Sequence, residues 1–368
     1  MDTHRTDPSA EPALATRATA GRGAVTNPAG RFERTRSQWF ADGWDTDPEV
    51  PESIATEVLP ERARTIITRN DSPDVPFDRS INPYRGCEHG CVYCFARPAH
   101  AYVDLSPGLD FETRLFFKAD AANLLRRELS RPAYECRPIA FGTNTDPYQP
   151  VERRLRVMRS LLEVCSEFEH PVTITTKGAA ILDDLDLLTD MARRRLLSVA
   201  VSVTTLDDDL KRRLEPRTPS GRARLRLIAR LRDAGIPVGV MTAPIIPAIN
   251  DAELEDLLAA AAAAGAQRAA WILLRLPNEV AGLFRDWLTV HYPERAAHVM
   301  SLVSQSRGGR ANDPRFGVRM SGTGPFAALI ERRFDVAARR HGLQRSGDPL
   351  DRSRFRVPGA PAPQLDLF

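Results

Sequence analysis

The sequence predicts an α/β protein built on a parallel sheet. Short apolar runs, rich in β-branched residues, alternate with longer segments of helical period. Both kinds of segment recur at intervals of roughly thirty to forty residues, the spacing of successive strand–helix units. The 368 residues are 42% hydrophobic and 27% charged, so the chain can bury a substantial core. This alternation indicates a parallel sheet with right-handed crossovers, closed as a barrel or open.

The predicted strands are short runs bounded by turn formers. A complete barrel of this type needs eight strands, and only six are found. The six runs are around Ser80–Asn82, then Ile139–Gly142, Val172–Thr176, Leu197–Val203, Val238–Met241 and Ala270–Leu274.

Helices are predicted between the strands and again after Trp287. Gly235, followed by Pro237, should end one helix, and Asn250 with Asp251 should cap the next. The predicted helices are Ala119–Leu129, Glu152–Phe168, Leu182–Arg194, Arg222–Ala234, Ala252–Ala264, Pro293–Ser306 and Phe326–Arg340.

Composition shifts divide the chain into five expected parts. Residues 1–30 lack any periodic order and should form a disordered tail. Residues 31–78 form an N-terminal extension, whose Trp39, Phe40 and Trp44 could pack on the main body. Residues 79–290 form the core, 291–345 a helical C-terminal region, and 346–368 a C-terminal tail that is Pro-rich from Val357.

Charge and cysteine content favour a cytoplasmic protein. The formal net charge is +3, which argues against a strongly basic nucleic-acid coat. No apolar run approaches the roughly 18 residues of a membrane span, and the first thirty residues contain no apolar signal region. Five cysteines are an odd number for a disulfide framework, so a reducing compartment is expected.

Three of the five cysteines lie within eight residues, in the spacing C-x3-C-x2-C. Cys87, Cys91 and Cys94 could wrap one metal centre, since thiolates select zinc, copper(I) or iron–sulfur clusters. An iron–sulfur cluster held by three cysteines would leave one iron open. A closed zinc site needs a fourth ligand, which would have to be His89, His100, Cys136 or Cys165.

This motif, with the aromatic Tyr93 just before the third cysteine, resembles the signature of the radical S-adenosylmethionine (radical SAM) superfamily. Residues 82–87, 95–97 and 142–150 (GTNTDPYQP) resemble its spore photoproduct lyase-related branch. Within that branch the chain is most similar to uncharacterised proteins of actinobacteria and proteobacteria. The resemblance covers about residues 64 to 345.

The resemblance implies a fold, two cofactors and a reaction of lyase or oxidoreductase type. The fold would be a partial (β/α)6 TIM-like barrel with an N-terminal extension and a helical C-terminal region. Cys87, Cys91 and Cys94 would hold three irons of a [4Fe-4S] cluster, and the amino and carboxylate groups of SAM would chelate the fourth. Reductive cleavage would give a 5′-deoxyadenosyl radical that takes a hydrogen from an unknown substrate. The electron donor is expected to be of flavodoxin or ferredoxin type.

The resemblance also suggests SAM contacts around the cysteine motif and the second strand. Tyr93 would lie against the adenine, although a core aromatic beside the cluster explains it equally well. Thr143, Asn144 and Asp146 follow the second strand, where the family grips the methionine amino group. A turn stabilised by side-chain hydrogen bonds is the alternative for these three residues.

Further SAM contacts are expected at later strand ends. Lys177 ends the third strand and suits the SAM carboxylate. Only three of the 51 basic residues are lysines, which makes this one more notable. Ser202 ends the fourth strand, where the family places a ribose or carboxylate contact, and Arg217 is a weaker carboxylate candidate. A solvated lysine, a buried serine and a surface arginine are the alternative interpretations.

One residue departs from the lyases themselves. A cysteine near the end of their second strand returns a hydrogen to thymine, and Thr143 occupies that place here. DNA photoproduct repair therefore does not carry over from the resemblance.

Two other hypotheses stay open. One is a zinc-stabilised nucleic-acid-binding protein. The other is a radical SAM enzyme acting on DNA or RNA, with Arg193–Arg195 and Arg212–Arg213 lining a phosphate groove. Solvated helix faces explain those arginines more simply. The segment Arg307–Gly324 could cover the open side of the barrel.

Overall fold

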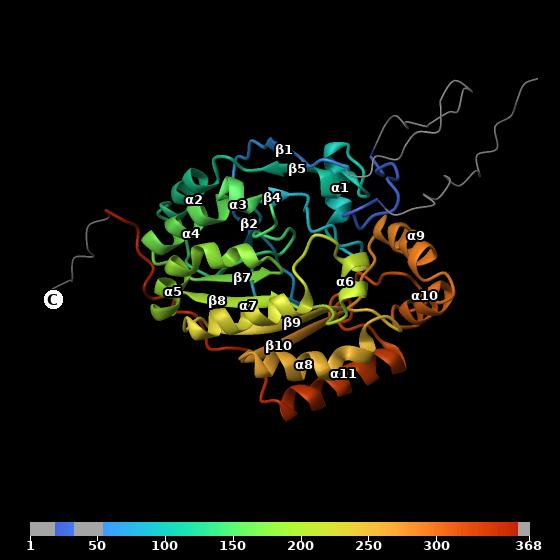
Figure 1. Ribbon diagram of the computed structural model, residues 1–368. Helices are drawn as coiled ribbons and strands as arrows, with labels where there is room; N and C mark the ends of the chain where they lie inside the picture. The colour runs from blue at the N-terminus through green and yellow to red at the C-terminus, as the bar shows by residue number, and fades with distance from the viewer. Residues whose placement is uncertain (1–18, 33–53, 360–368) are drawn as a thin grey trace, which may run out of the picture.

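A computed structural model describes residues 19–32 and 54–359 (Figure 1). In these residues the main sheet has the order β10-β9-β8-β7-β6-β3-β2, and only β2 pairs antiparallel. The six parallel strands form the partial (β/α)6 barrel, which confirms the predicted fold class. The strands are β2 (Thr68–Arg69), β3 (Arg79–Ile81), β6 (Ile139–Phe141), β7 (Val172–Thr176), β8 (Leu197–Ser202), β9 (Val238–Ile245) and β10 (Arg268–Leu273).

A smaller sheet with the order β1-β5-β4 lies beside the barrel. Its strands are β1 (Glu57–Pro60), β4 (Tyr84–Arg85) and β5 (Arg114–Phe117). Strand β4 pairs antiparallel with β5 and leads directly to Cys87. This sheet, which fixes the start of the cysteine motif, was not predicted, because its strands are too short to show a period.

The predicted helices are present, some of them divided. The expected helix Glu152–Phe168 is broken at Arg156, whose φ of 51° is left-handed. The α-helices are α1 (Asp110–Thr113), α2 (Ala121–Leu129), α3 (Glu152–Leu155), α4 (Val157–Glu167), α5 (Leu185–Arg193), α6 (Asp208–Leu214), α7 (Gly221–Asp233), α8 (Leu254–Ala263), α9 (Val280–His291), α10 (Ala296–Gln305) and α11 (Gly324–Arg340). The 3-10 helices are η1 (Arg97–Val103), η2 (Ala179–Asp184) and η3 (Asp251–Glu253).

The helix-boundary predictions had mixed outcomes. Gly235 follows α7 with φ 77°, and its N–H donates to Arg232, so the predicted stop is confirmed. Asn250 precedes η3 but its side chain does not cap it. The Asn250 amide instead donates to the carbonyls of Thr204 and Pro244, because a buried amide is better satisfied between two strand ends.

The two faces of the sheet differ in character. On β7 and β8 the residues facing the helices are large, apolar and buried, among them Ile174 and Val199. Alternate positions carry small or polar side chains that are half-exposed, and Thr173 and Thr175 pair in register with Ser198 and Ala200. The inner face at β7 and β8 is therefore lined by small and polar groups, which leaves this part of the barrel suited to a ligand.

A second apolar core surrounds the cysteine motif. It joins Cys91, Val92 and Tyr93 to residues of α6, α9 and α10, with Trp287 at 0% exposure. Figure 1 shows α9 and α10 together at one end of the barrel, next to α6. This core holds the motif at that end of the sheet.

Both ends of the described chain pack on the barrel. Arg22, Gly23, Ala24 and Val25 are buried, so the expected disorder of the first thirty residues is wrong for residues 19–30. The order comes from tertiary hydrogen bonds described below. Trp39, Phe40 and Trp44 lie outside the described residues.

Residues 344–356, which we call the C-terminal strap, run past the starts of β10, β8 and β7. Gln344 bonds to Gln267 and Ala269, and the N–H of Asp351 donates to the carbonyl of Arg195. Further along, the N–H of Arg356 donates to the carbonyl of Phe168. No helix in the described part of the chain is both long and apolar enough to span a bilayer.

Candidate functional site

The three clustered cysteines lie on residues 85–95, which we call the cysteine loop. Gly86 has φ +78°, and a Cβ there would lie 2.7 Å from the Leu115 side chain, so only glycine fits. Cys87 and Cys91 are each 7% exposed, and Cys94 is half-buried. None of the three is in a disulfide.

The surroundings of the buried thiols disfavour their charged thiolate form. Burial raises the pKa of Cys91 to about 12, while the ammonium group of Lys177 works against that rise. Burial also raises the pKa of Cys87, and interactions with Asp146, Cys91 and Cys94 raise it further. A hydrogen bond from the Asp146 backbone opposes this change. The three thiols therefore interact with one another, and a cationic metal centre would supply the charge that their thiolates need.

The donor set consists of three thiols with no disulfide among them, and thiolates suit zinc, copper(I) or an iron–sulfur cluster. Within residues 19–32 and 54–359, no three His, Cys, Asp or Glu side chains converge closely enough to hold one metal ion. A tetrahedral zinc site requires such convergence, with Zn–S distances of about 2.3 Å. A four-iron cluster is larger, so its thiolates stand farther apart.

The residues considered as a fourth zinc ligand have other contacts. Nδ1 of His89 is 3.4 Å from a carboxylate oxygen of Asp146. Nε2 of His100 is 2.8 Å from a backbone carbonyl. Cys165 is buried in the main core on α4, and Cys136 lies near it.

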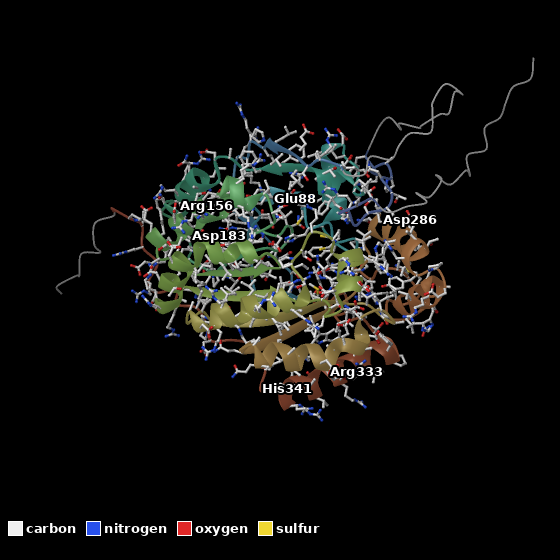
Figure 2. All side chains as sticks on the ribbon, viewed as in Figure 1. Glu88, Arg156, Asp183, Asp286, Arg333 and His341 are labelled. Carbon is white, nitrogen blue, oxygen red and sulfur yellow. The ribbon has the colours of Figure 1, made fainter. Side chains whose placement is uncertain are left out.

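A buried ion pair holds the cysteine loop from behind. Arg97 is 0% exposed, donates to the carbonyl of Cys91 at 3.0 Å, and pairs with the equally buried Glu112. The same carboxylate accepts the N–H groups of Gly23 at 2.9 Å and Ala24 at 2.8 Å. The N-terminal segment thus completes the support of the loop. Thr26 also donates to Asp286 of α9, which Figure 2 labels.

The segment after β6, residues 142–150, packs against the cysteine loop, and we call it the strand-end loop. Gln149 is fully buried, donates to the carbonyl of Gly86 at 3.3 Å and accepts the N–H of Glu88 at 2.8 Å. Figure 2 labels Glu88 in the upper central part of the view. The strand-end loop therefore has a structural role, because its Gln149 holds the cysteine loop in place.

Asp146 of the strand-end loop has its oxygens fully engaged. It accepts from Thr176 Oγ1 at 2.6 Å, Lys177 N at 2.7 Å and Tyr148 N at 2.9 Å, with His89 at 3.4 Å. Burial opposes ionisation, but His89 and these hydrogen bonds outweigh it and lower the pKa of Asp146 to about 2. A carboxylate offers about four acceptor sites, so all are used.

The two neighbours of Asp146 that were expected to bind SAM lie at the loop surface. Thr143 is half-exposed, and its hydroxyl is 3.3 Å from the Asn82 side chain. Asn144 is exposed, and its backbone N–H donates to the same Asn82 oxygen at 2.9 Å. The Asn144 side chain points to the surface and is accessible to a ligand.

Lys177 and Tyr93 face one another beside the cysteine loop. Nζ of Lys177 lies 5.9 Å from the centre of the Tyr93 ring and makes no hydrogen bond to another described residue. Burial lowers the pKa of Lys177, but Cys91 and Glu215 overcome this and raise it. An ammonium group in this state at a strand end is a ready site for an anion.

Glu215 is a site residue that the sequence reasoning missed. It is fully buried, pairs with Arg224, and accepts hydrogen bonds from Thr204 at 2.7 Å and from the Tyr93 hydroxyl. Burial opposes its charge, but Arg224 and Lys177 lower the pKa of Glu215 to about 2. A lone glutamate in an arginine-rich stretch gives no sequence signal of this role.

Ser202 and Arg217 flank this group. Ser202 is 4% exposed, and its carbonyl accepts from Arg224 at 2.9 Å. Arg217 is 36% exposed and pairs with Glu88 at 3.1 Å. Arg217 thus already has an acidic partner on the cysteine loop.

Comparison with known proteins gives consistent matches. Residues 81–261 match the radical SAM superfamily. An uncharacterized protein of Mycobacterium tuberculosis is 41% identical over 230 residues, which are 62% of this chain and 68% of that protein. An uncharacterized protein of Methanocaldococcus jannaschii is 24% identical over 197 residues, 54% of this chain and 71% of that protein.

Solved structures share the fold at low identity. A spore photoproduct lyase complexed with dinucleoside spore photoproduct superimposes with a TM-score of 0.56 at 16% identity, over 78% of this chain and 81% of that one. A mutant of spore photoproduct lyase, in which serine replaces a cysteine, gives a TM-score of 0.56 at 15% identity, with the same coverage. With the barrel, the cysteine loop and these matches taken together, the chain belongs to the radical SAM superfamily.

Proposed function

We propose that this chain is an enzyme that binds a [4Fe-4S] cluster through Cys87, Cys91 and Cys94 and cleaves SAM beside it. Radical SAM proteins use a [4Fe-4S] cluster and SAM. The observation that carries the proposal is the loop itself, which holds three cysteines, two buried and one half-buried, with no disulfide among them. When bound, the two cofactors supply a 5′-deoxyadenosyl radical that takes a hydrogen from the substrate.

The chain's own residues would orient SAM from two strand ends. Lys177 holds the SAM carboxylate, because its ammonium has no hydrogen-bond partner among the residues that the structure describes. Thr143 and Asn144 meet the amino group through the strand-end loop. Asp146 acts as a positioning residue, because its acceptor sites are occupied within the protein.

The remaining candidates have supporting roles in the proposal. Tyr93 packs beside the cluster and is fixed through Glu215, and the adenine would lie against its ring. Ser202 stands at the end of β8, where the ribose would lie. Arg217 is the weakest candidate for the carboxylate, since Glu88 already neutralises it. A flavodoxin- or ferredoxin-type protein would supply the electron for a reaction on a substrate that is still to be identified.

The test is anaerobic reconstitution of wild type, Cys91→Ala and the matched control Cys165→Ala. Wild type and the control should hold about four irons per chain with labile sulfide. On reduction with dithionite, both should convert SAM to 5′-deoxyadenosine and methionine, followed by mass spectrometry. Cys91→Ala should lose both properties, and full cluster content in that variant would refute the assignment.

The two alternatives gain no support from the structure. Superfamily membership disfavours the zinc-stabilised nucleic-acid-binding protein, and zinc without labile sulfide in the purified chain would reverse that. Arg194 pairs with Asp190 and Arg212 with Asp209, so two of the five arginines that the nucleic-acid hypothesis needs already have an acidic partner. DNA or RNA binding that weakens steeply with salt would restore the nucleic-acid hypothesis.

A further inference from the structure

Arg275 differs from the other arginines that lie inside this protein. It lies just beyond the carboxyl end of β10, where ligands of α/β barrels bind. Its Nε is buried without a hydrogen-bond partner in the described part of the chain, and its Nη1 is 3.4 Å from the thioether sulfur of Met320. A thioether is a weak acceptor and does not balance a positive charge.

The fully buried arginines of the described residues are compensated. Arg97 and Arg224 pair with buried carboxylates. Arg307 donates to four backbone carbonyls, two at the end of β10 and two of residues 318 and 319. Arg85 and Arg194 also have an unpartnered Nε, yet each pairs with a carboxylate. Arg275 lacks an acidic or carbonyl partner, and the half-buried Arg268, which also lacks one, donates instead to the Ser198 hydroxyl.

The surroundings of Arg275 are positively charged. Burial lowers its pKa, and the nearby Arg319 lowers it further, with only partial relief from Asp74. Asp74 already forms an ion pair with Arg319, at 2.5 Å. Arg275 is half-buried with a fully buried Nε, and a guanidinium in that state that is held near a second one, without its own counter-charge, is costly to the folded protein. A bound anion would remove that cost.

The position of Arg275 connects it to the cysteine loop. Its guanidinium carbon lies 5.3 Å from the centre of the Phe95 ring. Phe95 follows Cys94 directly and is 45% exposed, so part of its ring is accessible to a ligand. An unpaired cation and an exposed aromatic surface therefore adjoin each other next to the proposed cluster.

The segment Arg307–Gly324 borders the region around Arg275, which its Met320 contacts. The N–H of Leu273 donates to the carbonyl of Met320, and Arg319 joins the segment to the β2–β3 loop through Asp74. The segment thus links β10 to the far edge of the sheet, as the sequence suggested. It also presents Phe316, 55% exposed, under the guanidinium of Arg319 at 4.6 Å.

We propose that Arg275 and Phe95 form the substrate-recognition site, which takes an oxyanion carried next to a flat, unsaturated group. Arg275 binds the oxyanion, since its planar fork matches phosphate and carboxylate. The exposed part of the Phe95 ring contacts the flat group. The role as a substrate site rests on the proposed function, whereas the binding of the anion does not.

The experiment measures binding of three probes to the full-length chain, before and after anaerobic cluster reconstitution. Inorganic phosphate, phenyl phosphate and benzoate are titrated by isothermal calorimetry and by thermal shift. Stronger binding of phenyl phosphate than of benzoate identifies a phosphate substrate, and the reverse order identifies a carboxylate. A phenyl-bearing probe should bind more tightly than inorganic phosphate, and Phe95→Leu should remove that advantage.

The variants separate a ligand site from a general charge effect. Arg275→Met should weaken binding by about tenfold or more, the usual effect of a charge-assisted hydrogen bond. Arg275→Lys should bind the probes with an affinity between those of wild type and Arg275→Met, because lysine keeps the charge but lacks the planar guanidinium. Arg310→Met removes an exposed arginine from the neighbouring segment Arg307–Gly324 and should leave binding of the probes unchanged.

The melting temperature distinguishes a ligand-binding role of Arg275 from a structural role. Arg275→Met removes an uncompensated charge, so its melting temperature without probe should equal or exceed that of wild type. Absence of probe binding in wild type, or equal loss in Arg275→Met and Arg310→Met, would overturn the proposal. Because binding is read without SAM, its failure is distinct from failure of the cluster to assemble.

Discussion

The ion pair beneath the cysteine loop offers a direct test of what holds that loop in place. Arg97 and Glu112 are both completely buried, and Arg97 also donates to the carbonyls of Cys91, Pro107 and Gly108. Removing one partner of such a pair leaves the other charge buried, which typically costs about 3–5 kcal/mol. Glu112 would keep the N–H groups of Gly23 and its neighbour as donors. We therefore expect a loss at the lower end of this range, about 3 kcal/mol, for Arg97→Met.

The assay is urea unfolding of the cluster-free chain followed by tryptophan fluorescence. Trp287 belongs to the apolar core around the loop and should report its loss. The matched control is Arg126→Met, which breaks a pair of similar geometry with Glu167, whose side chains are 46% and 44% exposed. Exposed pairs contribute about 0–1 kcal/mol, so the control should change little.

A double variant separates the effect of the two charges from the effect of the volume that their side chains fill. Arg97→Met combined with Glu112→Leu removes both charges, so it should cost less than the sum of the two single changes. If Arg97→Met destabilised the chain no more than Arg126→Met, the buried pair would not be what secures the cysteine loop.

Three further predictions concern pH and glycine. Burial lowers the pKa of His170 from 6.5 to about 4, so the folded chain favours its neutral form. The stability this contributes is present above pH 6.5 and is lost as the pH falls toward 4, by about 2 kcal/mol between pH 7 and pH 5. His170→Phe should flatten that part of the stability curve in urea titrations, and an unchanged slope would contradict the assignment. Gly142→Ala should cost at least about 2 kcal/mol in urea unfolding, because φ is +82° and a Cβ would overlap the carbonyl of Thr175; a loss below 1 kcal/mol would argue against that overlap. Gly282→Ala should instead stabilise α9 by about 0.5–1 kcal/mol, since that position is exposed and open, and a melting temperature shifted the other way would count against it.

Sequence-based prediction was most informative where period and local chemistry agree. Strand β7 has the predicted bounds Val172–Thr176, because its alternating pattern and flanking turn residues are all local signals. The cysteine spacing identified the superfamily for the same reason, since the motif is contained in one short loop. Helix α9 was missed, because Val280–His291 packs on the small core of the cysteine loop and falls outside the strand–helix repeat.

Long-range partners account for what the sequence did not show. Residues 19–30 have no pattern, and their order depends on Glu112, which lies 89 positions after Gly23. Asp146 was expected to face SAM, yet its oxygens turn toward β7 and His89. Glu215 is a similar case, since only the fold brings it beneath Tyr93. In each case the deciding contact joins segments that are distant in the chain.

The C-terminal strap sets an order of events during synthesis. Its N–H at Arg356 reaches the carbonyl of Phe168, and its N–H at Asp351 reaches that of Arg195, so both contacts close very long loops. Such contacts form late, because the intervening chain must be made and folded first. The cysteine loop and its N-terminal partner are synthesised long before the strap. The strand starts stay uncovered until the strap leaves the ribosome, so this end of the barrel is covered only after the cysteine loop has been made.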